Sequence, residues 1–303
     1  MNSGDVNTEA IDPRYAEFDA WPTADILAAM YQGQIAAVEA VRLALPALAR
    51  AVEDAARALV CEGRLVYVGA GTSGRIGVQD GAELVPTFNW PLERLLFLIA
   101  GGDAALTRSI EGAEDNEAEA ARAIAEANIG PHDVVIGIAA SGTTPYTVAA
   151  LRAASEAGAV TIGIASNAHS PLLEAAAHPI LIESGSEAIA GSTRMKAGTA
   201  QKVVLNLFST ALMVRLGRVY RGTMVHMRAT NAKLVRRAGR IVAAISNCPP
   251  DTAARFVEEA KGDVKLAILL AHGLRSEEAV QLLEHHHGNL RAAIAALGAD
   301  RHG

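Results

Sequence analysis

The residues best suited to chemistry form a glycine-rich turn with two hydroxyl side chains, directly after an apolar segment. The turn reads Gly69-Ala70-Gly71-Thr72-Ser73-Gly74-Arg75, and a helix is predicted to begin within it. Backbone N–H groups at a helix start, side-chain hydroxyls and the positive end of the helix dipole all favour an anion. The sequence therefore predicts a phosphate site here. Its predicted binding residues are Gly71, Thr72, Ser73 and Arg75.

A second hydroxyl-rich turn follows a later apolar segment, residues 134–139. It reads Ser141-Gly142-Thr143-Thr144-Pro145. Like the first turn, it stands between a predicted strand and a predicted helix. Two such units predict one monophosphate that is held from two sides. The second side would consist of Ser141, Gly142, Thr143 and Thr144.

The first turn also fits the dinucleotide pattern G-x-G-x-x-G, which is a competing interpretation. A dinucleotide site needs an acidic residue at the end of the next strand, about 20 residues on. The next predicted strand ends in Gly101-Gly102, and the first acidic residue, Asp103, comes too late. We therefore favour a phosphosugar over a dinucleotide.

Hydroxyl and cationic residues gather a third time, at the predicted start of a long helix over residues 194–216. They are Ser192, Thr193, Arg194 and Lys196. One interpretation is a capping motif with solvated cations, and the other is a hydroxyl pair that holds a phosphate or a sugar hydroxyl. The residues alone leave both open.

Composition excludes several classes of partner. The chain has 303 residues, a net charge of −6 and 4% aromatic residues. This charge gives no attraction to nucleic acid or to an acidic membrane, and few aromatic rings are present to stack on bases. No apolar run approaches the roughly 18 residues of a membrane span, and the acidic N-terminal region lacks a signal-peptide pattern. Two cysteines without a disulfide framework fit a reducing compartment, so we expect a cytoplasmic protein.

Short apolar strands alternate with helical stretches from residue 64 onward. Strands without polar alternation, separated by helices, predict an α/β fold whose parallel sheet is covered on both faces. Thr23 is predicted to cap a first helix, Pro46 to open another, and everything after Thr193 to be helical. The predicted strands are Leu65–Val68, Leu95–Ala100, Val134–Ala139, Val160–Ala165 and Pro179–Ile182.

The tail contains an internal repeat in which residues 253–268 align with residues 279–294. The alignment places Gly262 over Gly288 and Asp263 over Asn289. Each copy predicts a helix ended by glycine, with Asp or Asn capping the next helix. The repeat resembles ubiquitin-associated-type helical modules, and we expect its main role to be packing.

Longer motifs connect these pieces. They are Gly69–Gly74 with Arg75, Glu83-x-x-Pro86-Thr87, Ala100-Gly101-Gly102, Glu111–Asp115, Ala140–Gly142, Thr144–Tyr146, Gly191–Lys202 and Asn231-x-Lys233-Leu234. Through these motifs the chain resembles the N-acetylmuramic acid 6-phosphate etherases. The resemblance implies a three-layer α/β/α sugar isomerase (SIS) domain with a parallel sheet. The implied divisions are an N-terminal helical segment at 1–53, the phosphosugar-binding SIS domain at 54–218 and a helical C-terminal domain at 219–303.

Etherases of this family cleave the D-lactyl ether of N-acetylmuramate 6-phosphate, giving N-acetylglucosamine 6-phosphate and D-lactate in the recycling of cell-wall amino sugars. In the ring-opened sugar the aldehyde acidifies the C2 hydrogen, and lactate leaves from C3. Elimination needs a base for C2–H and an acid for the departing oxygen, and water then adds at C3. The resemblance implies Glu83 as the acid and Glu114 as the base, with no metal and no other cofactor.

Each glutamate also has an ordinary explanation. Glu83 fits a solvated residue near a helix end, and Glu114 fits an acidic helix start that the dipole favours. A straight helix from Ser73 would place Glu83 about 15 Å from the phosphate end, but Pro86 predicts that this helix ends just after Glu83. The sugar reaches Glu83 if the helix is short or bent, or if a second subunit completes the site. We expect a homodimer.

Further expectations concern the surroundings of these residues. Glu187 is expected to contact the sugar. Thr143 stands where family members carry a basic residue, which predicts weaker phosphate binding, and Ala82 stands where they carry serine. Because Ala82, Leu84 and Val85 are apolar, they predict surroundings that favour a protonated Glu83.

Two functions of other kinds remain open. A non-catalytic phosphosugar sensor, similar to the animal glucokinase regulatory protein, would not need both Glu83 and Glu114. A phosphosugar aldose–ketose isomerase would need one base and no acid for a leaving group on C3. The pair of glutamates therefore favours the etherase, with a small phosphosugar as its substrate.

Overall fold

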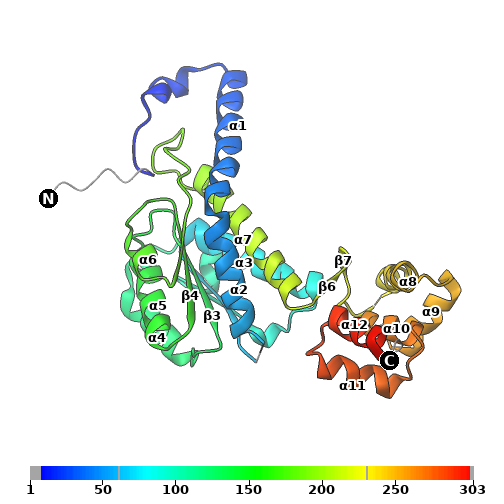
Figure 1. The fold of residues 1–303 in the computed structure, drawn as a ribbon. Coiled ribbons are helices and arrows are strands. Elements are labelled where there is room, and N and C mark those ends of the chain that lie inside the picture. Colours follow the sequence, from blue (N-terminus) through cyan, green and yellow to red (C-terminus); the bar gives the residue numbers. More distant parts are fainter. Residues whose placement is uncertain (1–7, 61, 230, 301–303) are drawn as a thin grey trace. The chain divides into compact units, whose positions relative to one another are not determined.

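The computed structural model describes residues 8–60, 62–229 and 231–300, which form two compact units (Figure 1). Unit 1 comprises the chain up to residue 82 together with residues 92–209, and unit 2 comprises residues 83–91 and the chain from residue 210 onward. The predicted divisions after residues 53 and 218 stay predictions. In the part of the chain that the structure describes, no helix has the length and apolar character to cross a membrane.

Unit 1 is built on a five-stranded parallel sheet with the strand order β2-β1-β3-β4-β5. The apolar runs predicted all five strands, each to within one residue of its start. The strands are β1 (Leu65–Gly69), β2 (Leu95–Ile99), β3 (Val134–Ile138), β4 (Val160–Ala165) and β5 (His178–Leu181).

Helices cover both faces of this sheet, which gives three layers (Figure 1). Val66, Val68 and Val135 belong to a core cluster with the helices of one face, whereas Tyr67 points to the other face and contacts α3 through Asp80. The helices of the first face are α4 (Glu117–Glu126), α5 (Pro145–Glu156) and α6 (Pro171–Glu174), and those of the second are α2 (Leu45–Ala58), α3 (Gly71–Phe88) and α7 (Lys196–Arg215). The N-terminal helix α1 is Thr23–Ala40, and the short 3₁₀ helices are η1 (Pro13–Tyr15), η2 (Phe18–Ala20), η3 (Val41–Ala44), η4 (Leu92–Arg94), η5 (Asp103–Leu106) and η6 (Ala113–Asp115).

Two predicted helix ends are wrong. Thr23 is the first residue of α1, and Pro22 occupies the capping position. Helix α3 does not end after Glu83 but continues through Pro86 to Phe88. Proline is tolerated there because it lies in the last turn, where it removes a single backbone bond. The helix ends at Asn89, whose φ is 51° and whose N–H donates to the Val85 carbonyl at 2.9 Å.

The prediction that the chain is entirely helical after Thr193 is also wrong. A two-stranded antiparallel hairpin follows α7, with strands β6 (Val219–Tyr220) and β7 (Thr223–Met224). Its turn residues Arg221 and Gly222 have φ values of 47° and 71°. Positive φ at both central residues is the geometry of a tight hairpin turn, which sequence usually signals by Asn-Gly or Asp-Gly rather than Arg-Gly.

A buried carboxylate connects two helices of the second face to strand β1. Asp80 on α3 is 5% exposed and accepts hydrogen bonds from the Tyr67 hydroxyl at 2.9 Å, Asn206 Nδ2 at 2.6 Å and Ser209 Oγ at 3.1 Å. Burial raises the pKa of Asp80, and the hydrogen bond from Asn206 opposes this rise. The three bonds hold β1, α3 and α7 together.

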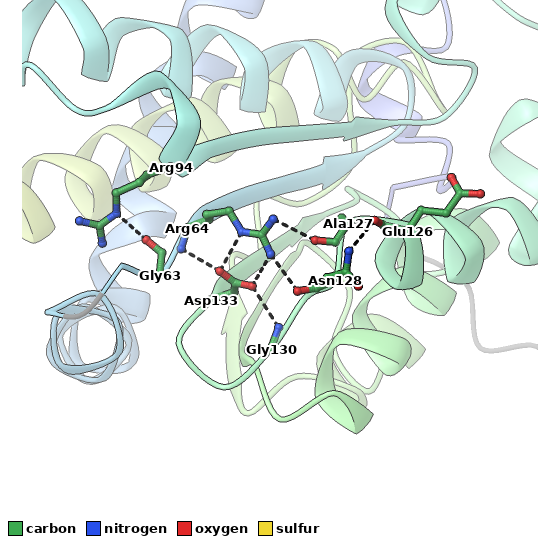
Figure 2. Close-up of polar contacts among 8 residues, drawn as sticks. All are labelled: Gly63, Arg64, Arg94, Glu126, Ala127, Asn128, Gly130 and Asp133. Carbon is green, nitrogen blue, oxygen red and sulfur yellow. Dashed lines mark hydrogen bonds and ion pairs between the residues drawn. The ribbon is translucent and has the colours of Figure 1, made fainter.

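A partly buried ion pair fixes the start of β1 (Figure 2). The guanidinium of Arg64 donates to Asp133 Oδ2 at 2.7 Å, and its backbone N–H donates to Oδ1 at 2.8 Å. The same guanidinium donates to the carbonyls of Ala127 and Asn128 at 2.9 and 3.0 Å. Burial opposes ionisation of Asp133, but the hydrogen bonds from Arg64 outweigh it and lower the pKa of this carboxyl. The pair joins β1 to the loop before β3.

Arg64→Met is expected to lower the free energy of unfolding by about 3 kcal/mol, because removing one partner leaves a buried charge unpaired. Since the pKa of Asp133 is lowered in the folded state, the stabilisation is present above the unfolded pKa of about 4 and is lost as the pH falls through the folded value. Urea unfolding at pH 7 and at low pH measures both effects. The control is Arg122→Met, because the pair of Arg122 with Glu126 is exposed and spans 3.5 Å. Equal losses in the two variants would contradict the assigned role.

Unit 2 is a helical module with its own apolar core. Its helices are α8 (Ala232–Ser246), α9 (Pro250–Glu259), α10 (Val264–Ala271), α11 (Ser276–His285) and α12 (Leu290–Asp300). Fully buried residues such as Val242, Val264 and Ile268 form the centre of this core.

The predicted tail repeat is confirmed as a structural repeat. Gly262 and Gly288 have φ values of 81° and 72°, and their N–H groups donate to residues five positions earlier at 2.9 and 2.7 Å. Asp263 then caps α10 and Asn289 caps α12 through side-chain oxygens. The preceding residues, Lys261 and His287, are also left-handed, so each turn contains two such residues where glycine alone was predicted.

Candidate active site

The two hydroxyl-rich turns leave neighbouring strands at the same edge of the sheet. In the register of β1, Gly69 pairs with Ile99 of β2 on one side and Ile138 of β3 on the other. The chain therefore passes from β1 to β2 on one side and then crosses to β3 on the other side of β1. This reversal makes the carboxyl ends of β1 and β3 a topological switch point. Crevices at such points, outside the carboxyl ends of parallel strands, are the usual ligand sites of open α/β sheets.

The first turn places its hydroxyls in the first turn of α3, which begins at Gly71. A side chain at Gly69 would put its Cβ 2.9 Å from the backbone of Gly74, so glycine permits the strand end and the helix start to approach. Ser73 is 9% exposed and its Oγ donates to Gln201 Oε1 on α7 at 3.1 Å. The predicted helix start is confirmed, and its free N–H groups face the edge of the sheet where an anion would bind.

The guanidinium of Arg75 is directed to a neighbouring loop. Its Nε donates to the Ala105 carbonyl at 2.9 Å and its Nη2 to the Arg108 carbonyl at 3.0 Å. Arg75 thus fixes the segment between β2 and η6, which leads to Glu114. This is a structural task that the sequence pattern did not distinguish from phosphate binding.

The second turn is held in shape by its neighbours. Gly142 has a φ of 71°, and a Cβ there would lie 2.1 Å from Ser170 Oγ, so only glycine fits. Ser141 Oγ accepts from the Thr143 N–H at 3.2 Å, and the Ser141 carbonyl accepts from Asn167 Nδ2 at 3.0 Å. No side chain caps α5, whose first residue is Pro145. The start of α5 therefore keeps backbone donors for a ligand.

The hydroxyls of the third cluster do not cap the helix that follows them. Helix α7 begins at Lys196, and its cap is the carboxylate of Glu187. Glu187 is 2% exposed, and its two oxygens accept from the backbone N–H groups of Lys196 and Ala197 at 3.0 and 3.1 Å. The capping interpretation of Ser192 and Thr193 is therefore wrong, because the carboxylate of Glu187, favoured by the helix dipole, takes the position. Their role in binding a phosphate or a sugar hydroxyl stays a prediction.

Lys196 is engaged on the same loop. Its Nζ donates to the Ser186 carbonyl at 3.0 Å, and burial lowers its pKa. Ser192 and Thr193 are half-buried just before the helix, and Arg194 is exposed.

Two residues near the second turn were missed by sequence reasoning. Thr8 accepts a hydrogen bond from Asn167 Nδ2 at 3.2 Å, and its carbonyl accepts from the Gly191 N–H at 3.1 Å. The N-terminal segment therefore lies against the loop after β4 and the loop before α7 (Figure 1). No local pattern marks either residue; Asn167 follows an apolar strand, which is the one available signal.

Glu114 lies in unit 1 on the short helix η6, after Gly112 with its φ of 69°. Helix α4 begins only at Glu117 and is capped by Asn116. An acidic helix start explains Glu117 and Glu119 on α4, whereas Glu114 belongs to the first turn of the separate short helix η6. The Glu114 side chain is exposed.

Glu83 lies in unit 2, on the last two turns of α3, and is exposed. Leu84 is 2% exposed and turns away from it into the core, and Ala82 is exposed. The apolar surroundings predicted for Glu83 are therefore not supplied by these neighbours. The short helix that would bring the sugar to Glu83 is likewise not found.

Comparison with known proteins identifies the fold family of unit 1. Residues 47–155 match the family model described as "Glucokinase regulatory protein N-terminal SIS domain". Residues 115–211 match the model described as "SIS domain". The predicted α/β SIS fold with a five-stranded parallel sheet and C-terminal helices is confirmed.

Nearly full-length relatives are more specific. An N-acetylmuramic acid 6-phosphate etherase of Deinococcus radiodurans is 50% identical over 288 residues, covering 95% of this chain and 94% of that protein. The etherase of Erwinia tasmaniensis is 45% identical over 97% of this chain and 96% of its own length. The etherase of Yersinia pestis is 45% identical over 97% of this chain and 100% of its own length. The chain therefore belongs to the N-acetylmuramic acid 6-phosphate etherase family of SIS-domain proteins.

Proposed function

We propose that this protein cleaves the D-lactyl ether of N-acetylmuramic acid 6-phosphate, giving N-acetylglucosamine 6-phosphate and D-lactate in the recycling of cell-wall amino sugars. The observation that carries the proposal is the 50% identity to an etherase across 95% of the chain. The convergence of two hydroxyl-rich turns at the switch point of the sheet supports a phosphosugar substrate.

The 6-phosphate is assigned to the two turns. Gly71, Thr72 and Ser73 bind it from the start of α3, and residues 141–144 bind it from the start of α5. Both helix starts offer backbone N–H groups and a positive dipole end. Glu187 and Lys196 support the loop before α7, because their polar atoms are already engaged there. The hydroxyls of Ser192 and Thr193 remain candidates for a sugar hydroxyl.

The chemistry is an elimination followed by hydration. Glu114 removes the C2 proton of the open-chain sugar, a C2–C3 double bond forms, and the C3–O bond breaks. Glu83 gives a proton to the departing oxygen, so lactate leaves as the alcohol. Water then adds to C3 while it gives a proton to Glu83, and Glu114 gives a proton to C2, which returns both glutamates to their starting states. General acid–base catalysis of this kind contributes about 10²–10⁴-fold to the rate.

We further propose that the protein acts as a homodimer. Helix α1 exposes an apolar stripe with one residue on each successive turn: Leu27, Tyr31, Ile35 and Val38 are 59%, 64%, 47% and 47% exposed. Such a stripe favours burial against another chain. Because α3 continues past Glu83 to Phe88, we assign to this second subunit the completion of the site around Glu83.

Incubation of the purified protein with N-acetylmuramate 6-phosphate, followed by enzymatic assay of D-lactate, tests the function. Unphosphorylated N-acetylmuramate is expected to be a very poor substrate. Equal turnover of the two sugars would show that the protein does not recognise the phosphate.

Ser73→Ala and Ser141→Ala are each expected to raise KM with little change in kcat. A lost hydrogen bond to a charged group costs about 1.5–3 kcal/mol. Ser155→Ala is the matched control, because Ser155 is exposed near the other end of α5. A normal KM in both loop variants would show that their hydroxyls do not contact the phosphate.

A further inference from the structure

Gln201 is a buried neighbour of Ser73 that the proposed chemistry does not use. It lies on α7, which packs against the start of α3: a Cβ at Gly198 would lie 3.4 Å from Ile76 and 3.7 Å from Thr72. The Ser73 hydroxyl donates to Gln201 Oε1 at 3.1 Å, and the two residues are 9% and 1% exposed. Both belong to unit 1, which also carries the two phosphate turns.

The amide nitrogen of Gln201 has no hydrogen-bond partner among residues 8–60, 62–229 and 231–300. Nε2 is buried and carries two N–H donors. Most buried polar groups of native proteins are hydrogen-bonded, so an unpaired donor requires an explanation. This donor belongs to a side chain whose oxygen already contacts the first turn. A ligand-bound state in which Nε2 has a partner would explain it.

The proton of the Ser73 hydroxyl is already used by Gln201. A serine hydroxyl has one donor and two lone pairs, whereas the oxygens of a phosphate are strong acceptors. With its proton on Gln201 Oε1, Ser73 presents lone pairs to a phosphate, and these repel the anionic oxygens. Ser73 can therefore bind the 6-phosphate only if its proton turns to the ligand.

The amide of Gln201 can supply what this change requires. Its oxygen and nitrogen are the two branches of one planar group, so a half-turn exchanges an acceptor for a donor at nearly the same shape. After the half-turn, Nε2 donates to Ser73 Oγ and gains the partner that it lacks. The hydroxyl proton is then free for a phosphate oxygen, and the two successive hydrogen bonds strengthen one another.

We propose that Gln201 is a positioning residue of the phosphate site. When the phosphate binds, the amide turns, Nε2 donates to Ser73 Oγ, and the Ser73 hydroxyl donates to the ligand. The inference rests on the proposed function, in which Ser73 binds the 6-phosphate. Because Gln201 acts only through the direction of one proton, its substitution should change KM and leave kcat near the wild-type value.

Two substitutions separate the donor from the acceptor at this position. Gln201→Glu keeps the size and the accepting oxygen, but as a carboxylate it has no donor and holds the Ser73 proton away from the phosphate. It is expected to raise KM for N-acetylmuramate 6-phosphate about ten- to a hundred-fold, as the loss of a hydrogen bond to a charged group does. Gln201→Met removes donor and acceptor, releases the proton and is expected to raise KM about two- to ten-fold. If the oxygen alone mattered, the order of the two variants would be the reverse.

The same substitutions in the Ser73→Ala background test whether Gln201 acts through Ser73. Gln201→Met should then raise KM no further, because the hydroxyl that it orients is gone. Gln201→Glu should add only the repulsion between its charge and the phosphate. If the buried charge prevents Gln201→Glu from folding, the cycle with Gln201→Met decides. Ser209→Ala is the matched control, because it removes a buried hydrogen bond of 3.1 Å from the same helix and should lower the thermal stability without a change in KM.

Binding of inorganic phosphate, measured by isothermal titration calorimetry, gives a readout that does not depend on catalysis. The Kd should rise in the order wild type, Gln201→Met, Gln201→Glu. A folded Gln201→Glu protein with wild-type KM and Kd would overturn the proposal, and so would a Gln201→Met change that costs the same factor with and without the Ser73 hydroxyl. A wild type that releases no lactate would remove the proposed function, and the order of the phosphate Kd values would still decide the role of Gln201.

Discussion

Glu114→Gln is expected to abolish both the release of D-lactate and the exchange of the C2 hydrogen with deuterated water. If Glu114 is the base, neither event can begin without it, and the rate should fall by at least about 10²–10⁴-fold. Glutamine keeps the size of the side chain and removes the basic oxygen. Because Glu114 is exposed on η6, the change should leave the fold intact. Mass spectrometry of the recovered sugar measures exchange, and an enzymatic assay measures lactate.

Glu83→Gln is the paired experiment, and the two variants should differ in one readout. Lactate release should be blocked, while Glu114 still removes and returns the C2 proton, because the aldehyde acidifies C2–H whether or not the ether oxygen is protonated. Glu111→Gln is a suitable control, since Glu111 is an exposed acid three residues before Glu114. Exchange that persists in Glu114→Gln and vanishes in Glu83→Gln would reverse the assignment. Full lactate release by either folded variant would exclude that residue from the mechanism.

Truncation after Asn247 is expected to destroy the folding of unit 2. It removes α9–α12 and uncovers the buried face of α8, formed by Ala238, Ile241, Val242 and Ile245. Exposed apolar residues of this kind favour aggregation or loss of the oligomer. Size-exclusion chromatography with light scattering measures the outcome. A truncated protein that is soluble, has an unchanged subunit number and is fully active would show that the tail is independent.

A milder pair of substitutions keeps this claim testable if the truncated chain cannot be purified. Ile268→Ala in α10 is expected to lower the free energy of unfolding by about 2–5 kcal/mol, because a fully buried side chain leaves a cavity. Val280→Ala in α11 is the control, since Val280 is 39% exposed. Similar losses of unfolding free energy in both variants would contradict the assignment of Ile268 to the core of unit 2.

The sheet could be predicted from the sequence because its strands are buried on both faces. Such strands are continuous apolar runs, as in Val134–Ile138, and flanking glycine and hydroxyl residues mark their ends. The tail repeat could be predicted equally well, because glycine followed by Asp or Asn indicates the end of one helix and the cap of the next. Helix α3 was misjudged at Pro86, where the last turn tolerates proline, and the hairpin at Arg221-Gly222 uses an uncommon turn pair.

Much of the candidate site depends on contacts that are distant in sequence. Glu187 caps a helix nine residues away, Asn167 reaches both Ser141 and Thr8, and Ser73 contacts Gln201 across 128 positions. Local patterns contain no information on these partners. The same holds for the cavity of unit 2 that Pro86 and Arg237 line, because these two residues are far apart along the chain.

The central claim is that the C3–O bond breaks by elimination and is replaced by a bond to a solvent oxygen. Turnover of N-acetylmuramate 6-phosphate in water enriched in ¹⁸O and deuterium tests it directly. The account predicts one ¹⁸O on C3 and one deuterium on C2 of N-acetylglucosamine 6-phosphate, together with D-lactate that carries neither label. Label in the lactate would show cleavage on its other side, and an absence of D-lactate would contradict the etherase function itself.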